Sequence, residues 1–409
     1  MTDTAQGREP ATAQPPADDF DAERALTTLR ALCTPDMQGR APGTPGHDLA
    51  TEFLAAELAS YGLTPERDGF AIREVMRLEA QPTLRVEGPP LDRALVHRAE
   101  FAEHPRTGPM TEPVTGPVTG QDAGEGEWAA LLAVPQGNAF VELADTLAAR
   151  GAAGILTAQN ADASGFLTKR VQGPSPVGLP VVAVRPDLLA DAVGAVVTAH
   201  VPLVRVPATG TNILAGLPGR DPRAKPILLT AHYDGVGADP ERHFPCAGDN
   251  ASGVAVLCEV ARVLCSSAPP ARPVLFALVD AEEIGTLGSG HHARRLREAG
   301  TEPDVLNLDM AGKFNGRVAV ELGPGDPVPQ HLIAALDASG RRLGIPLYAG
   351  TVASDNRRYA SAGFPAAGVG LGAAHYHSPL DSPERIEGDA LHKAGRLVLE
   401  AIRHLASPN

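Results

Sequence analysis

The sequence has few cysteines and few aromatic residues. Its four cysteines form no CxxC pair, which excludes the usual motifs of structural zinc and dithiol redox sites. Cys258 and Cys265 fall on one expected helix, where their separation places the Cα atoms about 10 Å apart, too far for a disulfide bond. We therefore expect all four cysteines to be free thiols.

Long apolar runs and a basic excess are also missing. No segment reaches the roughly 18 apolar residues of a membrane helix, and the N-terminus lacks the apolar core of a secretory signal. We expect a cytoplasmic protein without a membrane partner; a misassigned start would make secretion the alternative. The formal net charge of −14 argues against nucleic-acid binding, because phosphates require a basic surface.

The chain is long and rich in turn-forming residues. It has 409 residues, with 43 glycines and 38 prolines, and 43% of its residues are hydrophobic. This composition is globular, and the length exceeds that of one ordinary domain. We expect a disordered tail over 1–20, the first part of a core domain over 21–85, an inserted β-rich domain over 86–206 and the catalytic part of the core over 207–409.

The second half of the chain alternates apolar strands with helices. Strands are expected at 226–231, 273–279, 304–308 and 366–371. This order predicts an α/β fold, a three-layer αβα sandwich with a mostly parallel central sheet. In such sheets, active sites lie beyond the carboxyl ends of the strands.

Metal-capable side chains follow three of these strands. His232 ends the first, Glu282 and Glu283 follow the second, and Asp309 follows the third. Any one of them alone is more often a solvated loop residue, and Asp249, before an expected helix, could simply cap that helix. Together they converge on one edge of the sheet, which favours a metal site.

The chemistry of such a set fits zinc. Histidine nitrogen and carboxylate oxygen are zinc ligands, and two zinc ions can share a bridging carboxylate, here Asp249. Glu282 and Glu283 are adjacent and cannot point the same way, so one can bind metal while the other faces water. Asp234, two residues after His232, is placed to orient its imidazole.

Five segments of this half resemble one known family. They are AHYDGVG at 231–237, GDNASGVAV at 248–256, DAEEIGTLGS at 280–289, NLDMAG at 307–312 and YHSPLDS at 376–382. In order and spacing they are similar to the M28 family of zinc metallopeptidases. The resemblance implies a zinc-peptidase fold and an aminopeptidase that uses two zinc ions to hydrolyse a peptide or a peptide-like amide.

The resemblance also implies roles for single residues. The metal ligands would be His232, Asp249, Glu283, Asp309 and His377. One metal would be held by His232 and Glu283, the other by Asp309 and His377, with Asp249 as the bridge. Glu282 matches the general base, and Tyr376 matches a tyrosine that helps to polarise the scissile carbonyl. The insert, through GAAGILTAQ and LPVVAVR, resembles a protease-associated domain.

One segment departs from the family pattern. Where many members carry Ser-Asp-His, this chain has SDN at 354–356, so Asn356 replaces the histidine. Asp355 and Asn356 are our candidates for the substrate pocket. Cys246 and His375 lie near the ligands in sequence, but we expect Cys246 to pack in the core and rank His375 below His377.

Two other functions stay open on sequence grounds. A glutaminyl cyclase-like acyltransferase would use one zinc ion, and a binding protein on the same fold would use none. Because all five ligand positions are retained, the sequence favours two metals and hydrolysis.

Overall fold

The computed structural model describes residues 19–324 and 328–406, so nearly all of the tail expected over 1–20 lies outside the described residues. All four cysteines are free, as expected. None of the described helices combines the length and apolar character needed to cross a membrane.

The larger lobe is built on a sheet of eight strands. In spatial order they are β1 (Glu66–Leu78), β10 (Leu203–Leu217), β12 (Val274–Val279), β11 (Ile227–His232), β13 (Asp304–Leu308), β16 (Ala366–Gly370), β14 (Val318–Leu322) and β15 (Leu347–Ala349). The four central strands, from β12 to β16, are parallel, whereas β1, β10 and β14 pair antiparallel with their inner neighbours.

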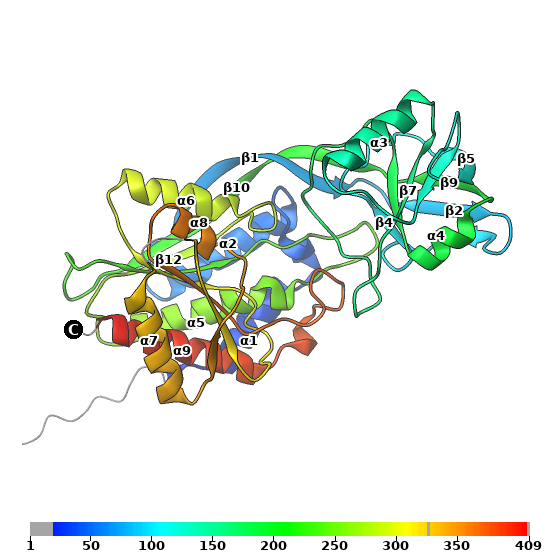
Figure 1. The fold of residues 1–409 in the computed structure, drawn as a ribbon. Coiled ribbons are helices and arrows are strands. Elements are labelled where there is room, and N and C mark those ends of the chain that lie inside the picture. Colours follow the sequence, from blue (N-terminus) through cyan, green and yellow to red (C-terminus); the bar gives the residue numbers. More distant parts are fainter. Residues whose placement is uncertain (1–18, 325–327, 407–409) are drawn as a thin grey trace, which may run out of the picture.

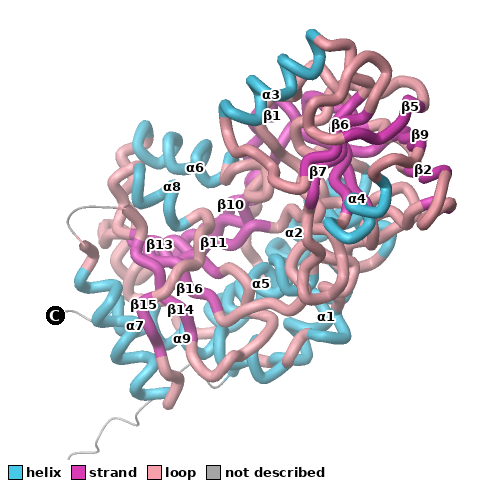
Figure 2. The backbone as a smooth tube through the Cα atoms, turned by 45° about the vertical axis from the view of Figure 1, so that its right-hand side comes forward, coloured by secondary structure: helices cyan, strands magenta, loops and turns pink. Residues whose placement is uncertain are grey.

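Helices cover both faces of this sheet (Figure 2). One layer contains α1 (Ala22–Leu32), α2 (Pro45–Ser60), α5 (Ser252–Ser266), α7 (Gln330–Leu343) and α9 (Gly388–Ala406). The other contains α6 (Leu287–Glu298) and α8 (Asn356–Ser361). Neighbouring residues of β11 divide between the layers: Leu229 packs in the first and Leu228 in the second. Burial on both faces explains the continuous apolar strands, and the predicted three-layer sandwich is confirmed.

The smaller lobe is built on a second sheet of eight strands (Figure 1). Its strands, in spatial order, are β3 (Arg93–Ala94), β2 (Thr83–Glu87), β9 (Val196–His200), β5 (Val114–Thr119), β6 (Trp128–Leu131), β7 (Gly154–Ala158), β8 (Val181–Val184) and β4 (Phe101–Glu103). It also holds α3 (Asn138–Ala149) and α4 (Pro186–Ala192). Trp128 is fully buried in the core of this lobe.

A two-stranded ribbon joins the lobes. β1 leaves the larger lobe, and β10 returns to it beside β1 along an antiparallel ladder that runs from Glu66↔Leu214 to Leu78↔Leu203. The strands of the second sheet therefore lie within 83–200, whereas we expected the insert over 86–206. The sequence analysis did not predict β1, because its burial follows no simple alternation and a register shift interrupts the ladder between Ile72 and Val75.

Candidate active site

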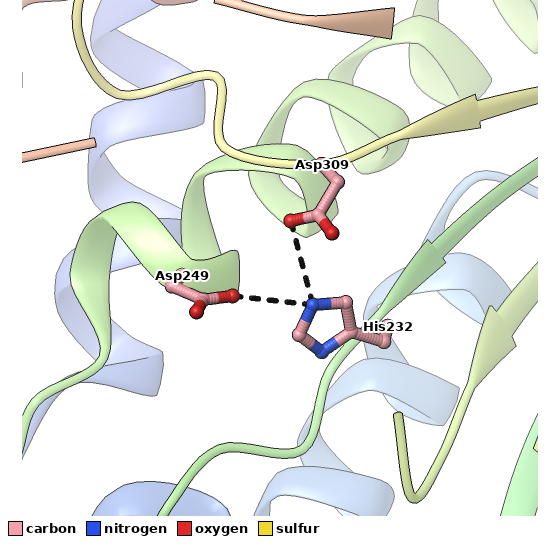
Figure 3. Close-up of side chains that lie close together, drawn as sticks. All are labelled: His232, Asp249 and Asp309. Carbon is pink, nitrogen blue, oxygen red and sulfur yellow. Dashed lines mark ion pairs between the residues drawn. The ribbon is translucent and has the colours of Figure 1, made fainter. Parts of the chain in front are cut away.

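Two of the predicted ligands, Asp249 and Asp309, meet a third, His232, at the end of β11 (Figure 3). The Nε2 atom of His232 lies 3.3 Å from Oδ1 of Asp249 and 3.5 Å from Oδ1 of Asp309. Asp249 belongs to the irregular turn η3 (Ala247–Ala251), and Asp309 directly follows β13. All three side chains are buried, and their ligand atoms could hold one metal ion.

A second group shares Asp249. The Nε2 atom of His377 lies 3.3 Å from Oδ2 of Asp249 and 2.9 Å from Oε2 of Glu283. Asp249 therefore presents one oxygen to each histidine, and the second group could hold another metal ion. Neither group contains a residue of the smaller lobe.

The ligands are not paired as we expected. The structure groups His232 with Asp309, and Glu283 with His377, whereas the expectation placed His232 with Glu283 and Asp309 with His377. β12 and β13 flank β11 on its two sides, so adjacency alone fits either pairing; Asp309 is the residue whose Oδ1 lies 3.5 Å from Nε2 of His232. The bridging position of Asp249 between the two groups matches the expectation.

The donor set fits a pair of cations. Oδ1 of Asp309 and both ring nitrogens of His232 are buried without a hydrogen-bond partner among the described residues. Burial lowers the pKa of His377, but Glu283 and Asp249 outweigh this effect and raise the pKa to about 10. Burial also acts against protonation of His232, yet Asp309 and its neighbours raise the pKa of His232 well above its usual value. The surrounding carboxylates thus create a negative field that stabilises bound positive charge.

Asp234 supports the site as a fully buried acceptor. Its Oδ1 lies 3.4 Å from Nδ1 of His232 and accepts a hydrogen bond of 3.0 Å from the backbone N–H of Glu282. Its Oδ2 accepts another, of 3.1 Å, from the N–H of Glu283. One carboxylate therefore lies beside the imidazole and accepts hydrogen bonds from the turn that carries both glutamates.

Asp381 is a supporting residue that the sequence analysis missed. Its carboxylate accepts hydrogen bonds from the backbone N–H groups of Gly248, at 2.7 Å, and Asp249, at 3.1 Å. Burial raises the pKa of Asp381 to about 7 although these two N–H groups lower it. The residue lies inside the YHSPLDS segment that identified His377, which was the available signal.

We expect Asp381→Asn to lower zinc affinity about 10- to 100-fold, the usual effect of removing an outer partner of a metal ligand. Asparagine offers one acceptor oxygen, and its amide NH₂ would face a backbone N–H. Zinc titration against a competing chelating dye measures the change. Asp389→Asn, on an exposed side chain of α9, is the matched control. Equal zinc affinity in the two variants would contradict the role of Asp381.

A cavity of about 400 Å³ opens beside the second group. Glu282, Glu283, Tyr376 and His377 line it. The Tyr376 ring stacks on the His377 ring, with centroids 3.7 Å apart, and its side chain is 49% exposed. Burial, with Asp355 and other nearby carboxylates, raises the pKa of Glu282 well above its usual value. The site therefore combines two candidate metal positions, a half-buried carboxyl with a raised pKa and open space.

Comparison with known proteins identifies the part of the chain that carries this site. Peptidase family M28 matches residues 212–402. The matched residues are slightly less than half of the chain. They contain all five candidate ligands, and Glu282 and Tyr376 with them.

Relatives and solved structures agree with this assignment. Aminopeptidase YwaD of Bacillus subtilis is 27% identical over 277 residues, which are 64% of this chain and 59% of the relative. A probable zinc metalloprotease of Pyrenophora tritici-repentis is 35% identical over 125 residues, 30% of this chain and 25% of the relative. The chain thus spans less than two thirds of either relative.

The fold is shared over almost the whole chain. The structure of BSAP, a zinc aminopeptidase from Bacillus subtilis, matches with a TM-score of 0.73 and 23% identity, over 95% of this chain and 96% of that one. An aminopeptidase from Aneurinibacillus sp. strain AM-1 matches with a TM-score of 0.69 and 22% identity, over 96% of both chains. The smaller lobe is therefore part of the shared fold.

Two residues of the M28 domain do not lie where we expected. Asp355 and Asn356 are both 0% exposed, and neither lines the cavity beside the ligands. Asp355 accepts a hydrogen bond of 2.5 Å from the hydroxyl of Ser289, and the Asn356 side chain packs close to Gly368 of β16. They begin helix α8 beneath the surface, so the structure places neither in contact with a substrate in this cavity.

Cys246 and His375 belong to neither ligand group of the M28 domain. Cys246 is buried in an apolar cluster with Val236 and Phe244, which agrees with a packing role. The carbonyl of His375 accepts hydrogen bonds from the backbone and side chain of Ser378, and so shapes the turn around His377.

The smaller lobe supplies one wall of the M28 cavity. The cavity wall, residues 168–172, contributes Thr168, Arg170, Val171 and Gln172 to the lining. Sequence reasoning missed this segment, because it carries no motif and reaches the site only through the packing of the two lobes.

Proposed function

We propose that the chain is a two-zinc aminopeptidase that hydrolyses the N-terminal amide bond of a peptide or peptide-like amide. The observation that carries the proposal is Asp249, whose two carboxylate oxygens face two different histidines. A bridging carboxylate is the feature expected of a two-metal hydrolase. The M28 match and the zinc aminopeptidase relatives support the same activity.

In the proposed ligand sets, His232 and Asp309 hold one ion, Glu283 and His377 hold the other, and Asp249 touches both. When bound, two zinc ions would polarise the scissile carbonyl and lower the pKa of a water molecule. Glu282 accepts the proton of the attacking water and donates it to the leaving amine. A carboxyl whose pKa is raised by burial suits both steps.

Tyr376 is placed to assist. Its ring stacks on His377, and the residue belongs to the lining of the cavity. Burial raises the pKa of Tyr376, so the phenol keeps its proton and can donate a hydrogen bond to the carbonyl oxygen of the substrate.

A single-zinc cyclase explains the site less well. A glutaminyl cyclase of Porphyromonas gingivalis shares the fold, with a TM-score of 0.52 and 17% identity. One ion would use one of the two buried groups and leave the other unused, although each group offers three ligand atoms for a metal ion.

The proposal also includes a role for the smaller lobe. We assign it as a protease-associated-like domain, inserted into the peptidase core between β1 and β10. Its cavity wall beside Glu282 supports a role in limiting which substrates enter.

We expect about two zinc ions per chain and hydrolysis of aminoacyl arylamides. Elemental analysis of protein dialysed after zinc loading gives the stoichiometry, and a panel of aminoacyl p-nitroanilides gives the activity. A chelator should abolish turnover, and added zinc should restore it. A ratio of one zinc per chain under saturating zinc would favour the cyclase instead.

A further inference from the structure

Arg170 is the exposed basic residue of the cavity wall. Exposure along the segment alternates: Lys169 and Val171 are buried, whereas Arg170 and Gln172 are exposed. This period of two is that of an extended chain. Arg170 therefore lies exposed in the cavity lining, while Lys169 and Val171 on either side of it are buried and anchor the segment.

The anchors hold the cavity wall firmly. Nζ of Lys169 lies 2.7 Å from Oδ1 of the fully buried Asp239. The carbonyl of Val171 accepts a hydrogen bond of 3.0 Å from the N–H of Met76. In the amide orientation that satisfies both of its ends, Gln172 donates to the carbonyl of Ile284, at 3.1 Å, and accepts from the N–H of Gly285, at 3.2 Å.

Arg170 itself has no acidic partner. It forms no ion pair with any residue of 19–324 or 328–406. Glu103, which shares a small neighbouring cavity with it, is already paired with Arg98 and lies 3.3 Å from His97. Burial, Arg106 and Arg170 together lower the pKa of His104 to about 4, which agrees with a locally positive field.

The chemistry of the guanidinium group and the charge of the substrate indicate which part of a peptide lies beside Arg170. The guanidinium group presents a planar set of donors that matches a carboxylate. The substrate of an aminopeptidase carries an ammonium group beside the scissile bond, and Arg170 repels that group. Glu283 belongs to the second candidate metal group and Glu282 is its neighbour in the chain, so the scissile bond is expected on their side of the cavity. We therefore assign Arg170 to the part of the peptide beyond the scissile bond.

We propose that Arg170 determines specificity by binding a substrate carboxylate on the leaving-group side of the scissile bond. The inference rests on the proposed aminopeptidase function and narrows its substrates to short or acidic peptides. The carboxylate is either the C-terminus of a dipeptide or tripeptide, or the side chain of an acidic residue. A cavity of about 400 Å³ is near the lower end for ligand sites and suits a short peptide.

Matched peptide pairs test the proposal and separate the two carboxylates. Leu-Gly against Leu-Gly-amide reports the C-terminus, and Leu-Glu-amide against Leu-Gln-amide reports the side chain. For at least one pair we expect kcat/KM to favour the carboxylate by about 10- to 100-fold, the range for a hydrogen bond to a charged group. Arg170→Gln should erase this ratio, and Arg170→Lys should keep part of it.

Arg106→Gln is the matched control, because it removes the same charge nearby from a residue that does not line the cavity. It should keep the wild-type ratio. A wild-type ratio near one for both pairs overturns the proposal. So does an equal change of the ratio in Arg106→Gln and Arg170→Gln, since that result would reflect the general field of the lobe.

A binding experiment keeps this inference separate from the proposed function. Zinc-loaded Glu282→Gln, expected to bind without turnover, is titrated calorimetrically with both peptide pairs, with and without Arg170→Gln. A carboxylate preference that depends on Arg170, in a protein whose wild type hydrolyses no peptide, would reject the aminopeptidase and keep the Arg170 assignment. Hydrolysis of leucine p-nitroanilide without any carboxylate preference would reject the Arg170 assignment and keep the aminopeptidase.

Discussion

Glu282→Gln lowers the turnover of an aminoacyl arylamide by about 10²- to 10⁴-fold, the usual contribution of a general acid–base group. Glutamine keeps the size of the side chain but cannot take the proton of the attacking water or give it to the leaving amine. Both zinc ions remain bound, because neither ligand group includes Glu282. Turnover and zinc content are measured on the same preparation.

Glu283→Gln is the matched comparison for this variant, since it makes the same change one residue away. Glu283 lies 2.9 Å from His377, so its replacement should reduce zinc content as well as turnover. Turnover of Glu282→Gln within a few fold of wild type would reject the general base. Loss of zinc from Glu282→Gln, with zinc retained in Glu283→Gln, would mean that the two residues exchange roles.

Asp249→Ala should remove more zinc than any other single ligand substitution. Its two oxygens face His232 and His377 separately, at 3.3 Å in each case, so its loss weakens both metal positions. Asp309→Ala removes a carboxylate from one group only and should leave the other ion in place. Elemental analysis after dialysis at limiting free zinc gives both values.

Circular dichroism spectra of both variants exclude unfolding as the cause of lost metal. An equal loss of zinc from Asp249→Ala and Asp309→Ala would contradict the bridge. The two positions would then depend on each other through some contact other than the Asp249 carboxylate.

The ligand positions were predictable because they follow apolar strands. His232 and Asp309 follow β11 and β13, parallel neighbours whose carboxyl ends must lie at one edge of the sheet. The pairing of ligands was not predictable in this way. β11 has β12 on one side and β13 on the other, and chain order alone does not say which carboxylate meets the histidine.

The supporting residue Asp381 and the residues that line the cavity could not be predicted from the sequence, because their positions depend on tertiary contacts. Asp381 accepts a hydrogen bond from Gly248, which lies 133 positions earlier in the chain, and no spacing in the sequence links the two. Asp355 and Asn356 resembled pocket residues by their place in the chain, but α8 turns both beneath the surface. The cavity wall with Arg170 belongs to another lobe, so only its packing reveals it.

The ribbon of β1 and β10 has a consequence for how such a protein diversifies. Leu78 and Leu203 are direct partners in its ladder, and partners in an antiparallel pair have Cα atoms about 5 Å apart. For the larger lobe, the chain between Leu78 and Leu203 is therefore a loop whose two ends are adjacent in space. Under the proposed function, exchange of that loop or substitutions within it would change which peptides are accepted without moving a candidate metal ligand. Substitutions that alter catalysis and substitutions that alter substrate selectivity can thus arise in different parts of the chain.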